Sequence, residues 1–360
     1  MPASQSASLG DVCVLRLSAL GDVCNLVPSL RALQAAAPAT RITWVIGRAE
    51  YSLLEGLEGI ELLVYDKSSG LKGMRALRQQ LLEQRQGRPF DLLLHMQAAL
   101  RASVLSRFIP AQRRIGFDSA RAKDYQGWFV NEQIAPHPRA HVGEGFLDFV
   151  RHLGCPLSQP EWRLPLPDAA REAAQALRPH SSYLLLSPCS SQRARNWRNW
   201  SLEGYAALAD YAWQRYGLAT VISGGNTPME QDAAAKISAW SQAPITNLVG
   251  KTSLKVLLAL IEQARCVVAP DSGPIHMAAA LGTPPLGLYV TSNPERTGPW
   301  RGREYVVNAY PQAVRQFLGK EEDQVGWGQR VRDPDAIDLI TQEAVFAALD
   351  RVMAGPARLD

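Results

Sequence analysis

Residues 269–285, A-P-D-S-G-P-I-H-M-A-A-A-L-G-T-P-P, combine features that suit an anionic ligand. An apolar run at residues 266–269 predicts a short buried strand, and a helix of small residues, ended by Gly282, follows the turn at Gly273. Unpaired N–H groups and the helix dipole at such an N-terminus attract negative charge. The stretch therefore predicts a corner that binds a diphosphate.

Three polar side chains of this stretch could take part in binding. Asp271 and Ser272 stand where a helix cap is expected, and Pro274 suits the first helical turn. We expect Asp271, Ser272 and His276 to reach sugars attached to the diphosphate. The alternative is an ordinary strand–helix turn in which the aspartate only caps.

A second candidate carboxylate follows the first predicted strand, residues 11–17. The segment S-A-L-G-D at residues 18–22 ends in Asp22, which could act as a general base or as the first-turn acid of the next helix. G-x-G-x-x-G is absent after this strand, which argues against an NAD-dependent oxidoreductase.

Two further loops follow predicted strands in the second half of the chain. Residues 190–197, S-S-Q-R-A-R-N-W, offer hydroxyls and two guanidinium groups that suit a diphosphate, or else form an exposed loop anchored by the tryptophan. Residues 223–226, S-G-G-N, form a turn that allows close backbone approach, although two glycines alone are weak support.

Composition predicts a globular protein with an uneven distribution of basic charge. The 360 residues are 46% hydrophobic and 20% charged, with a formal net charge of +4, which favours two domains of ordinary size. Basic residues dominate 71–88 and 101–123. These runs could attract phosphates, acidic sugars, an anionic membrane surface or nucleic acid, or could be solvated helix faces. Few aromatic residues interleave with the basic ones, so nucleic acid is not the expected partner.

Several other functions lack their sequence signals. There is no H-E-x-x-H, no clustered Cys/His, no G-x-S-x-G and no P-loop, and Asp333-Pro334-Asp335 is predicted to be a turn and cap, so no metal site is expected. The five cysteines show no C-x-x-C spacing, which fits a reducing cytosol. No signal peptide and no apolar run of about 20 residues is seen, so any membrane contact should be peripheral.

Strands and helices alternate along both halves of the chain, which predicts α/β domains with parallel sheets. Residues 155–167 hold four prolines and read as a linker. We expect two Rossmann-like, doubly wound domains facing a central cleft, at residues 1–165 and 166–335. A last helix in 336–360 could pack back on the first domain.

Four segments together resemble glycosyltransferase family 9, the heptosyltransferases of lipopolysaccharide core assembly. They are L-R-L-S-A-L-G-D-V at residues 15–23, R-R-I-G-F-D at 113–118, N-W-R-N-W at 196–200 and P-D-S-G-P-I-H-M-A-A-A-L-G-T-P at 270–284. The branch that adds the first heptose is the most similar, through residues 117–121 and 138–141. The resemblance implies the GT-B fold, with acceptor on the first domain and the ADP-heptose donor on the second.

The resemblance also implies roles for single residues. The family's catalytic carboxylate falls on Asp22, and its diphosphate-binding lysine on Arg195, with Arg193 as the alternative. The implied donor-binding residues are Ser190, Ser191, Arg195, Asn226, Asp271, Ser272, Gly273 and His276. The family's ribose-binding acid has no clean counterpart, since Glu230 lies further along the chain. The implied acceptor-binding residues are Ser18, Gly21, Arg75, Arg78, Gln97, Arg121 and His141.

These roles imply an inverting transfer of L-glycero-D-manno-heptose from ADP-heptose to Kdo of Kdo-lipid A, without a divalent metal or other cofactor. The protein is then expected to be a cytoplasmic monomer in peripheral contact with the inner membrane. The alternatives are a family member for a later core heptose or another sugar, or a non-catalytic nucleotide-sugar binding module.

Overall fold

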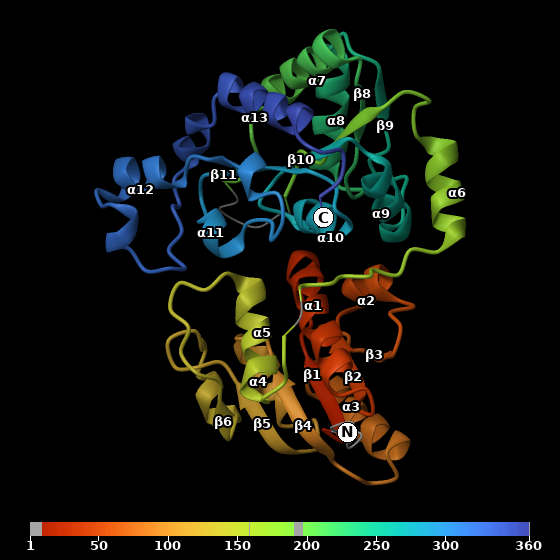
Figure 1. Ribbon diagram of the computed structural model, residues 1–360, viewed down its shortest axis with the longest axis vertical. Coiled ribbons are helices and arrows are strands. Elements are labelled where there is room, and N and C mark those ends of the chain that lie inside the picture. Colours follow the sequence, from red (N-terminus) through yellow and green to blue (C-terminus); the bar gives the residue numbers. More distant parts are fainter. Residues whose placement is uncertain (1–8, 158, 191–196, 360) are drawn as a thin grey trace, which may run out of the picture. The chain divides into compact units, whose positions relative to one another are not determined.

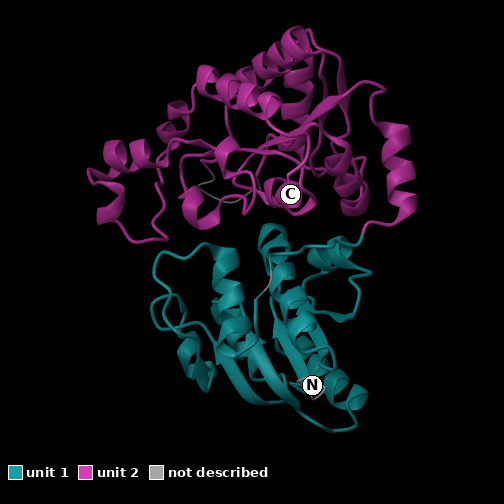
Figure 2. Ribbon diagram, viewed as in Figure 1, with its two compact units in different colours: residues 1–165 teal, residues 166–360 magenta. Residues whose placement is uncertain are grey.

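A computed structural model describes residues 9–157, 159–190 and 197–359 of the chain. The chain divides into two compact units, Met1–Pro165 and Leu166–Asp360 (Figure 2). Among the described residues, each unit contains one six-stranded sheet, and the strand pairs of both sheets are parallel.

The first unit has the strand order β3-β2-β1-β4-β5-β6 (Figure 1). Its strands are β1 (Asp11–Leu15), β2 (Arg41–Ile46), β3 (Ile60–Val64), β4 (Phe90–His95), β5 (Ala111–Gly116) and β6 (Glu132–Gln133). Its helices are α1 (Leu20–Ala36), α2 (Arg48–Leu54), α3 (Gly70–Gln84), α4 (Leu100–Ser106), the 3₁₀ helix η1 (Gln126–Phe129) and α5 (Val142–His152).

The second unit has the strand order β12-β11-β10-β7-β8-β9. Its strands are β7 (Tyr183–Leu186), β8 (Ala219–Ile222), β9 (Ile245–Asn247), β10 (Cys266–Pro270), β11 (Pro285–Tyr289) and β12 (Val307–Asn308). Its α-helices are α6 (Asp168–Leu177), α7 (Leu202–Tyr216), α8 (Pro228–Trp240), α9 (Leu254–Gln263), α10 (Gly273–Leu281), α11 (Pro294–Thr297), α12 (Tyr310–Leu318) and α13 (Gln342–Ala354). The 3₁₀ helices are η2 (Arg303–Tyr305), η3 (Glu322–Gln324) and η4 (Pro334–Leu339).

The central strands are apolar along their whole length because helices cover both faces of each sheet. Strand β7 reads Y-L-L-L and β10 reads C-V-V-A-P, and all nine residues are buried. A parallel sheet covered on both sides favours such continuous runs over alternation. In the first unit, α3 and α4 pack into one core with the sheet, while α1 and α5 pack against each other. Right-handed crossovers place α1 and the α3–α4 pair on opposite faces.

Both sheets reverse their strand order at one position. The reversal falls between β1 and β4 in the first unit and between β7 and β10 in the second. In open α/β sheets, ligands bind outside the carboxyl ends of the strands at this position. We call that side of each sheet its carboxyl edge. The residues that follow these four strands are therefore the candidates for a binding site.

The predicted α/β architecture with two doubly wound parallel sheets is confirmed. The sequence pattern missed the helices α2, α6, α11 and α12, and it placed no strand at β6 or β12. The last helix, α13, belongs to the second unit, where it packs against α7. Asp333 accepts a hydrogen bond from the backbone N–H of Asp335 at the start of η4, which is the predicted turn and cap.

Candidate active site at the carboxyl edges of the two sheets

Asp22 lies in the first turn of α1. This helix follows β1 in the chain (Figure 1). Its Oδ2 accepts a hydrogen bond from the backbone N–H of Ala19 at 3.1 Å and forms an ion pair with a terminal nitrogen of Arg16. Asp22 is therefore a first-turn acid of the helix, one of its two predicted roles. A carboxylate offers about four acceptor sites, so the cap and the ion pair do not by themselves prevent it from accepting a proton.

Arg16 is a site residue that the sequence pattern did not single out. Its other terminal nitrogen donates to the carbonyl of Met96 at 2.7 Å, and its guanidinium lies 5.2 Å from the ring centre of Phe146 on α5. The Arg16 guanidinium thus connects the ends of β1 and β4 and fixes the position of the Asp22 carboxylate. One signal in the sequence could have identified Arg16: it is a charged residue between two leucines, directly after the last residue of β1.

Gln97 joins the same two strand ends. Its Oε1 accepts from the backbone N–H of Leu17 at 2.6 Å, and its Nε2 donates to Ser18 Oγ at 3.4 Å. Gly21 is buried in the first turn of α1. The structure therefore brings together three predicted acceptor residues, Ser18, Gly21 and Gln97, with Asp22 at one edge.

His95, the last residue of β4, lies beneath this edge and is fully buried. Its Nε2 lies 3.2 Å from Ser103 Oγ, and its Nδ1 has no hydrogen-bond partner. Burial, together with the charges of Arg114 and Arg16, lowers the pKa of His95 to about 3. The imidazole is therefore neutral at physiological pH.

Arg121 lies in a cluster of charged residues beside α5, and His141 stands at the start of that helix. Arg121 donates to Asp148 at 2.6 Å and to the carbonyl of Ala135 at 2.9 Å, and it pairs with Asp118. His141 is the N-cap residue of α5 and accepts from the backbone N–H of Gly143 at 3.1 Å. Both residues have structural tasks here, so their contact with an acceptor stays a prediction.

Asp148 is the centre of this cluster. It is nearly buried and also receives hydrogen bonds from Arg151 and His137, at 2.6 and 3.1 Å. Burial acts to raise the pKa of Asp148, but the hydrogen bonds from Arg121, Arg151 and His137 outweigh it, so that the pKa lies below its ordinary value. The cluster therefore depends on an ionised carboxylate.

Arg75 and Arg78 are exposed on α3. This helix packs with α4 on the sheet face opposite α1, so these two residues lie apart from the Asp22 side chain. No described contact joins them to Asp22, and their role in acceptor binding stays a prediction.

In the second unit, Asp271 lies directly after β10 and is mostly buried. Its Oδ2 accepts from Ser292 Oγ at 2.7 Å. Arg198 donates to the Asp271 carbonyl at 2.8 Å and lies 3.8 Å from the carboxylate. Asp271 therefore joins the ends of β10 and β11 to the segment after β7. Arg198 is a cation that the sequence pattern passed over in favour of its neighbours.

The predicted side-chain capping of α10 is wrong. Ser272 is its N-cap residue by position, but its hydroxyl makes no capping bond and is buried without a partner. Asp271 turns to Ser292 instead. The first turn of α10 also carries no acidic residue. No side-chain cap therefore covers the start of α10, where a helix N-terminus favours an anion, and His276 is buried one turn later.

The other predicted donor residues differ in their surroundings. Ser190 is buried after β7, and its hydroxyl donates to Asn199 Oδ1 at 2.8 Å. Asn226 is exposed after β8 and accepts from Gln231 Nε2 at 2.6 Å. Ser191, Arg193 and Arg195 lie outside the described residues.

The Glu230 carboxylate forms hydrogen bonds within the protein, in the turn between β8 and α8. Its carboxylate accepts from the backbone N–H groups of Gly225 and Thr227, at 2.7 and 3.2 Å, and from the Thr227 hydroxyl at 2.6 Å. Thr227 in turn accepts from the Glu230 N–H, which completes a capping box at the start of α8. The carboxylate thus fixes the turn after β8.

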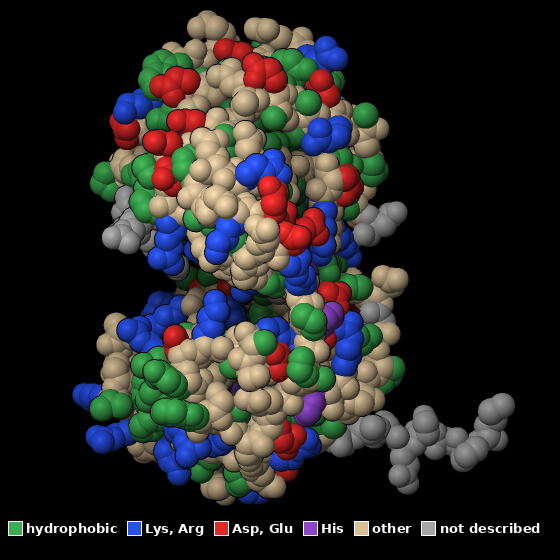
Figure 3. Space-filling model, turned by 90° about the vertical axis from the view of Figure 1, so that its left-hand side faces the viewer, with side chains coloured by type: hydrophobic (Ala, Val, Ile, Leu, Met, Phe, Trp, Pro, Cys, Tyr) green, Lys and Arg blue, Asp and Glu red, His purple; other side chains and the backbone are tan. Residues whose placement is uncertain are grey.

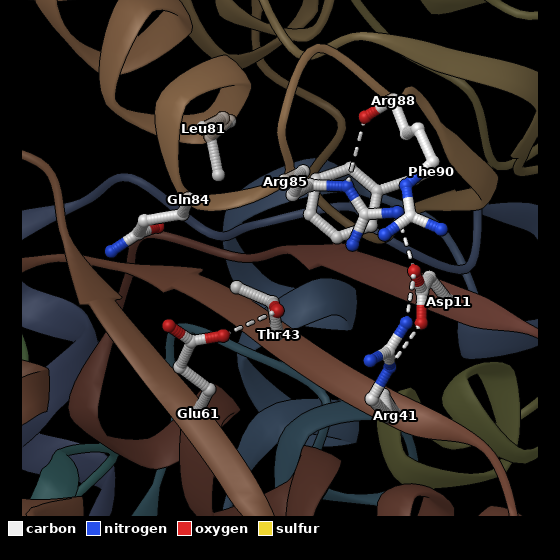
Figure 4. A pocket seen from close by; sticks show the side chains of 9 residues that line it. All are labelled: Asp11, Arg41, Thr43, Glu61, Leu81, Gln84, Arg85, Arg88 and Phe90. Carbon is white, nitrogen blue, oxygen red and sulfur yellow. Dashed lines mark hydrogen bonds and ion pairs between the residues drawn. The ribbon is translucent and has the colours of Figure 1, made fainter.

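A polar cavity of about 170 Å³ lies at the opposite edge of the first sheet (Figure 4). Asp11 at the start of β1 pairs there with Arg41 and Arg85, both at 2.5 Å, and the Arg85 guanidinium lies 3.9 Å from the centre of the Phe90 ring. The hydrogen bonds from these two arginines lower the pKa of Asp11, and the bond from Arg41 has the larger effect. Asp11 is paired within the protein, and the cavity lies at the amino ends of the strands rather than at the carboxyl edge where ligands bind in such sheets, so it is not the candidate site.

Within the described part of the chain, no group of three or more His, Cys, Asp or Glu side chains could hold a metal ion. No helix in the same ranges is both long and apolar enough to cross a membrane.

Comparisons with known proteins agree with this fold. The model of "Glycosyltransferase family 9 (heptosyltransferase)" matches residues 74–323. The lipopolysaccharide core heptosyltransferase OpsX of Haemophilus influenzae is 36% identical over 342 residues, which are 95% of this chain and 96% of that protein.

Two solved structures have a similar fold. A family 9 glycosyl transferase from Veillonella parvula DSM 2008 superposes with a TM-score of 0.76 at 22% identity, covering 96% of this chain and 97% of that one. The E. coli heptosyltransferase WaaC, solved with ADP, gives a TM-score of 0.71 at 19% identity, covering 95% and 99%.

The architecture is that of the GT-B glycosyltransferases, as the sequence predicted. The chain belongs to glycosyltransferase family 9, the heptosyltransferase family, since the family model matches more than half of it. The predicted enzyme class, a glycosyltransferase, is thereby confirmed.

Proposed function

We propose that this enzyme transfers L-glycero-D-manno-heptose from ADP-heptose to Kdo of Kdo-lipid A, in the synthesis of the lipopolysaccharide inner core. Similarity to a protein named lipopolysaccharide core heptosyltransferase supports the pathway, and the E. coli relative solved with ADP supports the nucleotide. The observation that carries the proposal is the Asp22 carboxylate, held by Arg16 at the carboxyl end of β1.

Asp22 is the general base in this proposal. It takes the proton from an acceptor hydroxyl while that oxygen attacks the anomeric carbon of the heptose. The bond from this carbon to the diphosphate breaks on the opposite face, so the configuration inverts and ADP leaves with the bonding electrons. A carboxylate in reach of the proton typically contributes a factor of about 100 to 10,000.

The second unit meets the charge that develops on ADP. The N–H groups at the start of α10, the Ser272 hydroxyl and the Arg198 guanidinium are fixed donors near the ends of β7 and β10. One such donor, placed in advance, is worth about 3 kcal/mol in known enzymes. We propose that these donors, with Ser191 and Arg195, neutralise the diphosphate without a divalent ion.

The first unit binds the acceptor. Ser18, Gly21 and Gln97 surround the base at the carboxyl edge, and Arg75, Arg78, Arg121 and His141 supply charge and hydrogen bonds for the anionic groups of Kdo and lipid A. Such an acceptor lies in a membrane, so the enzyme is placed in the cytoplasm, in peripheral contact with the inner membrane.

The test is ADP release from ADP-L-glycero-D-manno-heptose with Kdo-lipid A as acceptor, in EDTA. We expect release that depends on the acceptor, is absent with UDP- and GDP-sugars, and is lost in Asp22→Asn. A strict Mg²⁺ requirement would contradict the metal-independent mechanism. Release only with an acceptor that already carries heptose would move the enzyme to a later step and refute the chosen acceptor.

A further inference from the structure

Four large apolar side chains are strongly exposed on the first unit: Leu71, Leu100, Tyr125 and Trp128, at 59, 50, 65 and 78%. Tryptophan is usually well buried, so 78% exposure on a tryptophan calls for a partner or a membrane. Figure 3 shows hydrophobic side chains at the surface of this unit with Lys and Arg side chains nearby.

Three of these side chains lie together at the carboxyl edge. The Tyr125 and Trp128 rings stack at a tilt, with centroids 4.8 Å apart. Asp124 Oδ2 accepts from the backbone N–H of Leu100 at 3.2 Å, which joins this turn to the first residue of α4. The backbone at Asp124 and Tyr125 has φ of +50° and +60°, a region that non-glycine residues rarely adopt.

Basic side chains flank the apolar ones. Lys123 and Arg101 are exposed beside the turn and on α4. Arg101 also donates to the carbonyl of Lys67 at 3.3 Å, which connects α4 to the loop before α3. Leu71 and Lys72 are exposed in the first turn of α3. We call Leu100, Tyr125, Trp128, Arg101 and Lys123 the edge patch.

The edge patch combines exposed apolar side chains with exposed basic ones, and this combination suits binding to an anionic lipid surface. Tryptophan and tyrosine favour the headgroup region, where the ring is covered and its polar group stays hydrated. Lysine and arginine near an anionic bilayer add about 1 kcal/mol each. We propose that the edge patch docks the enzyme on the surface of an anionic bilayer. This proposal deepens the proposed function, because the patch lies at the same edge of the sheet as Asp22.

The first experiment is co-sedimentation of the full chain with vesicles, which needs no substrate. Vesicles of phosphatidylglycerol and phosphatidylcholine (30:70) are compared with pure phosphatidylcholine. We expect wild type to bind the anionic vesicles, Trp128→Ser with Tyr125→Ser to bind about tenfold more weakly, since apolar burial supplies the anchoring, and 0.5 M NaCl to weaken wild type. The control is Trp240→Ser on α8, a tryptophan that is 45% exposed, which should bind like wild type.

A second variant separates charge from apolar anchoring. Arg101→Gln with Lys123→Gln should lose about fivefold for each cation on anionic vesicles and change nothing on phosphatidylcholine. Three outcomes would each overturn the proposal. Wild type does not bind the anionic vesicles, or Trp240→Ser loses as much vesicle binding as the aromatic variant. The third is self-association of wild type that the aromatic variant abolishes.

Activity on detergent-dispersed acceptor distinguishes this proposal from the proposed function. The aromatic variant should keep wild-type turnover there and lose it on acceptor embedded in vesicles. If wild type binds vesicles but transfers no heptose, the docking surface stands and the proposed reaction fails.

Discussion

Helices α1 and α10 both begin where a central strand of a parallel sheet ends, yet their N-termini are different. The first turn of α1 carries Asp22, which accepts from Ala19 N–H and pairs with Arg16. The first turn of α10 has no acid, and its N-cap hydroxyl, on Ser272, has no partner. The same strand order thus presents a fixed negative charge in one unit and electropositive N–H groups in the other.

This difference is the basis on which we propose different chemistry for the two edges. A carboxylate held by an arginine suits proton transfer, and a helix N-terminus without its own acid suits an anion. The structure also shows where each edge is supported: by Arg16 and Gln97 between β1 and β4, and by Arg198 and Ser292 around Asp271.

The largest effect should come from Asp22→Asn, which keeps the shape of the side chain but removes the base. We expect kcat to fall by about 100- to 10,000-fold, with ADP affinity within about twofold of wild type. Turnover and ADP titration on the same preparation measure both. Asp338→Asn, at an exposed carboxylate on η4, is the control and should leave both unchanged. Transfer that survives Asp22→Asn would reduce Asp22 to a helix cap.

Asp148→Asn should cost about 2 kcal/mol in the free energy of unfolding at pH 7, because a buried carboxylate that accepts hydrogen bonds from charged donors is lost, among them the partly buried Arg121. The folded pKa of Asp148 is lowered, so its stabilisation is complete above the unfolded value near 3.8 and is lost as pH falls through the folded pKa. The difference from wild type should therefore shrink in strong acid. Urea titrations at pH 7 and below pH 4 measure it.

The matched control is Asp168→Asn, whose side chain is 92% exposed and pairs with Arg171 at 3.2 Å. An exposed pair contributes at most about 1 kcal/mol. Equal losses for Asp148→Asn and Asp168→Asn would show that the cluster near α5 adds nothing beyond surface electrostatics.

Arg16→Lys should lower kcat by about ten- to a hundredfold, because a point charge cannot hold both the Met96 carbonyl and Asp22. Donor KM should change little, since Arg16 is a positioning residue. The double variant Arg16→Lys, Asp22→Asn should be no worse than Asp22→Asn alone, because the two residues act as a pair. Additive losses would mean that Arg16 acts independently of Asp22.

His95 predicts a pH effect on stability. Its folded pKa is about 3, and an unfolded histidine titrates near 6.5, so the unfolded chain binds one more proton between these values. Stability should therefore fall as pH drops below about 6.5, by up to about 1.4 kcal/mol per pH unit from this residue. His95→Gln should have a shallower slope from pH 6 to pH 4. An unchanged slope would show that His95 does not titrate in this way.

The smallest effect is expected at α10. Ser272→Ala should weaken ADP binding by about five- to tenfold, the value of one hydrogen bond, and should leave stability equal or slightly higher, because the hydroxyl has no partner without ligand. Ser238→Ala on α8 removes another buried hydroxyl without a partner and is the control. Ser238→Ala should leave the ADP affinity unchanged. Equal effects of the two variants would remove Ser272 from the donor site.

The sequence by itself determined the two parallel sheets, because apolar strands alternating with helices leave few other arrangements. It also placed Asp22, Gln97 and Asp271 at strand ends, and parallel strands bring such residues to one edge. Gly282 ends α10 in a left-handed conformation, at φ +73°, as its type and position predicted.

Only the tertiary structure decided which partners these residues meet. Arg16 donates to the carbonyl of Met96, about 80 residues away in the sequence, and Arg198 donates to the carbonyl of Asp271, about 70 residues away. These distant contacts place both arginines at the candidate edges. Asp271 could have capped α10, but its carboxylate accepts a hydrogen bond from Ser292, which follows the end of the neighbouring strand. Glu230 likewise became a cap for the turn after β8. Local sequence fixes which groups are available, whereas hydrogen bonds between distant strand ends fix which of them remain for a ligand.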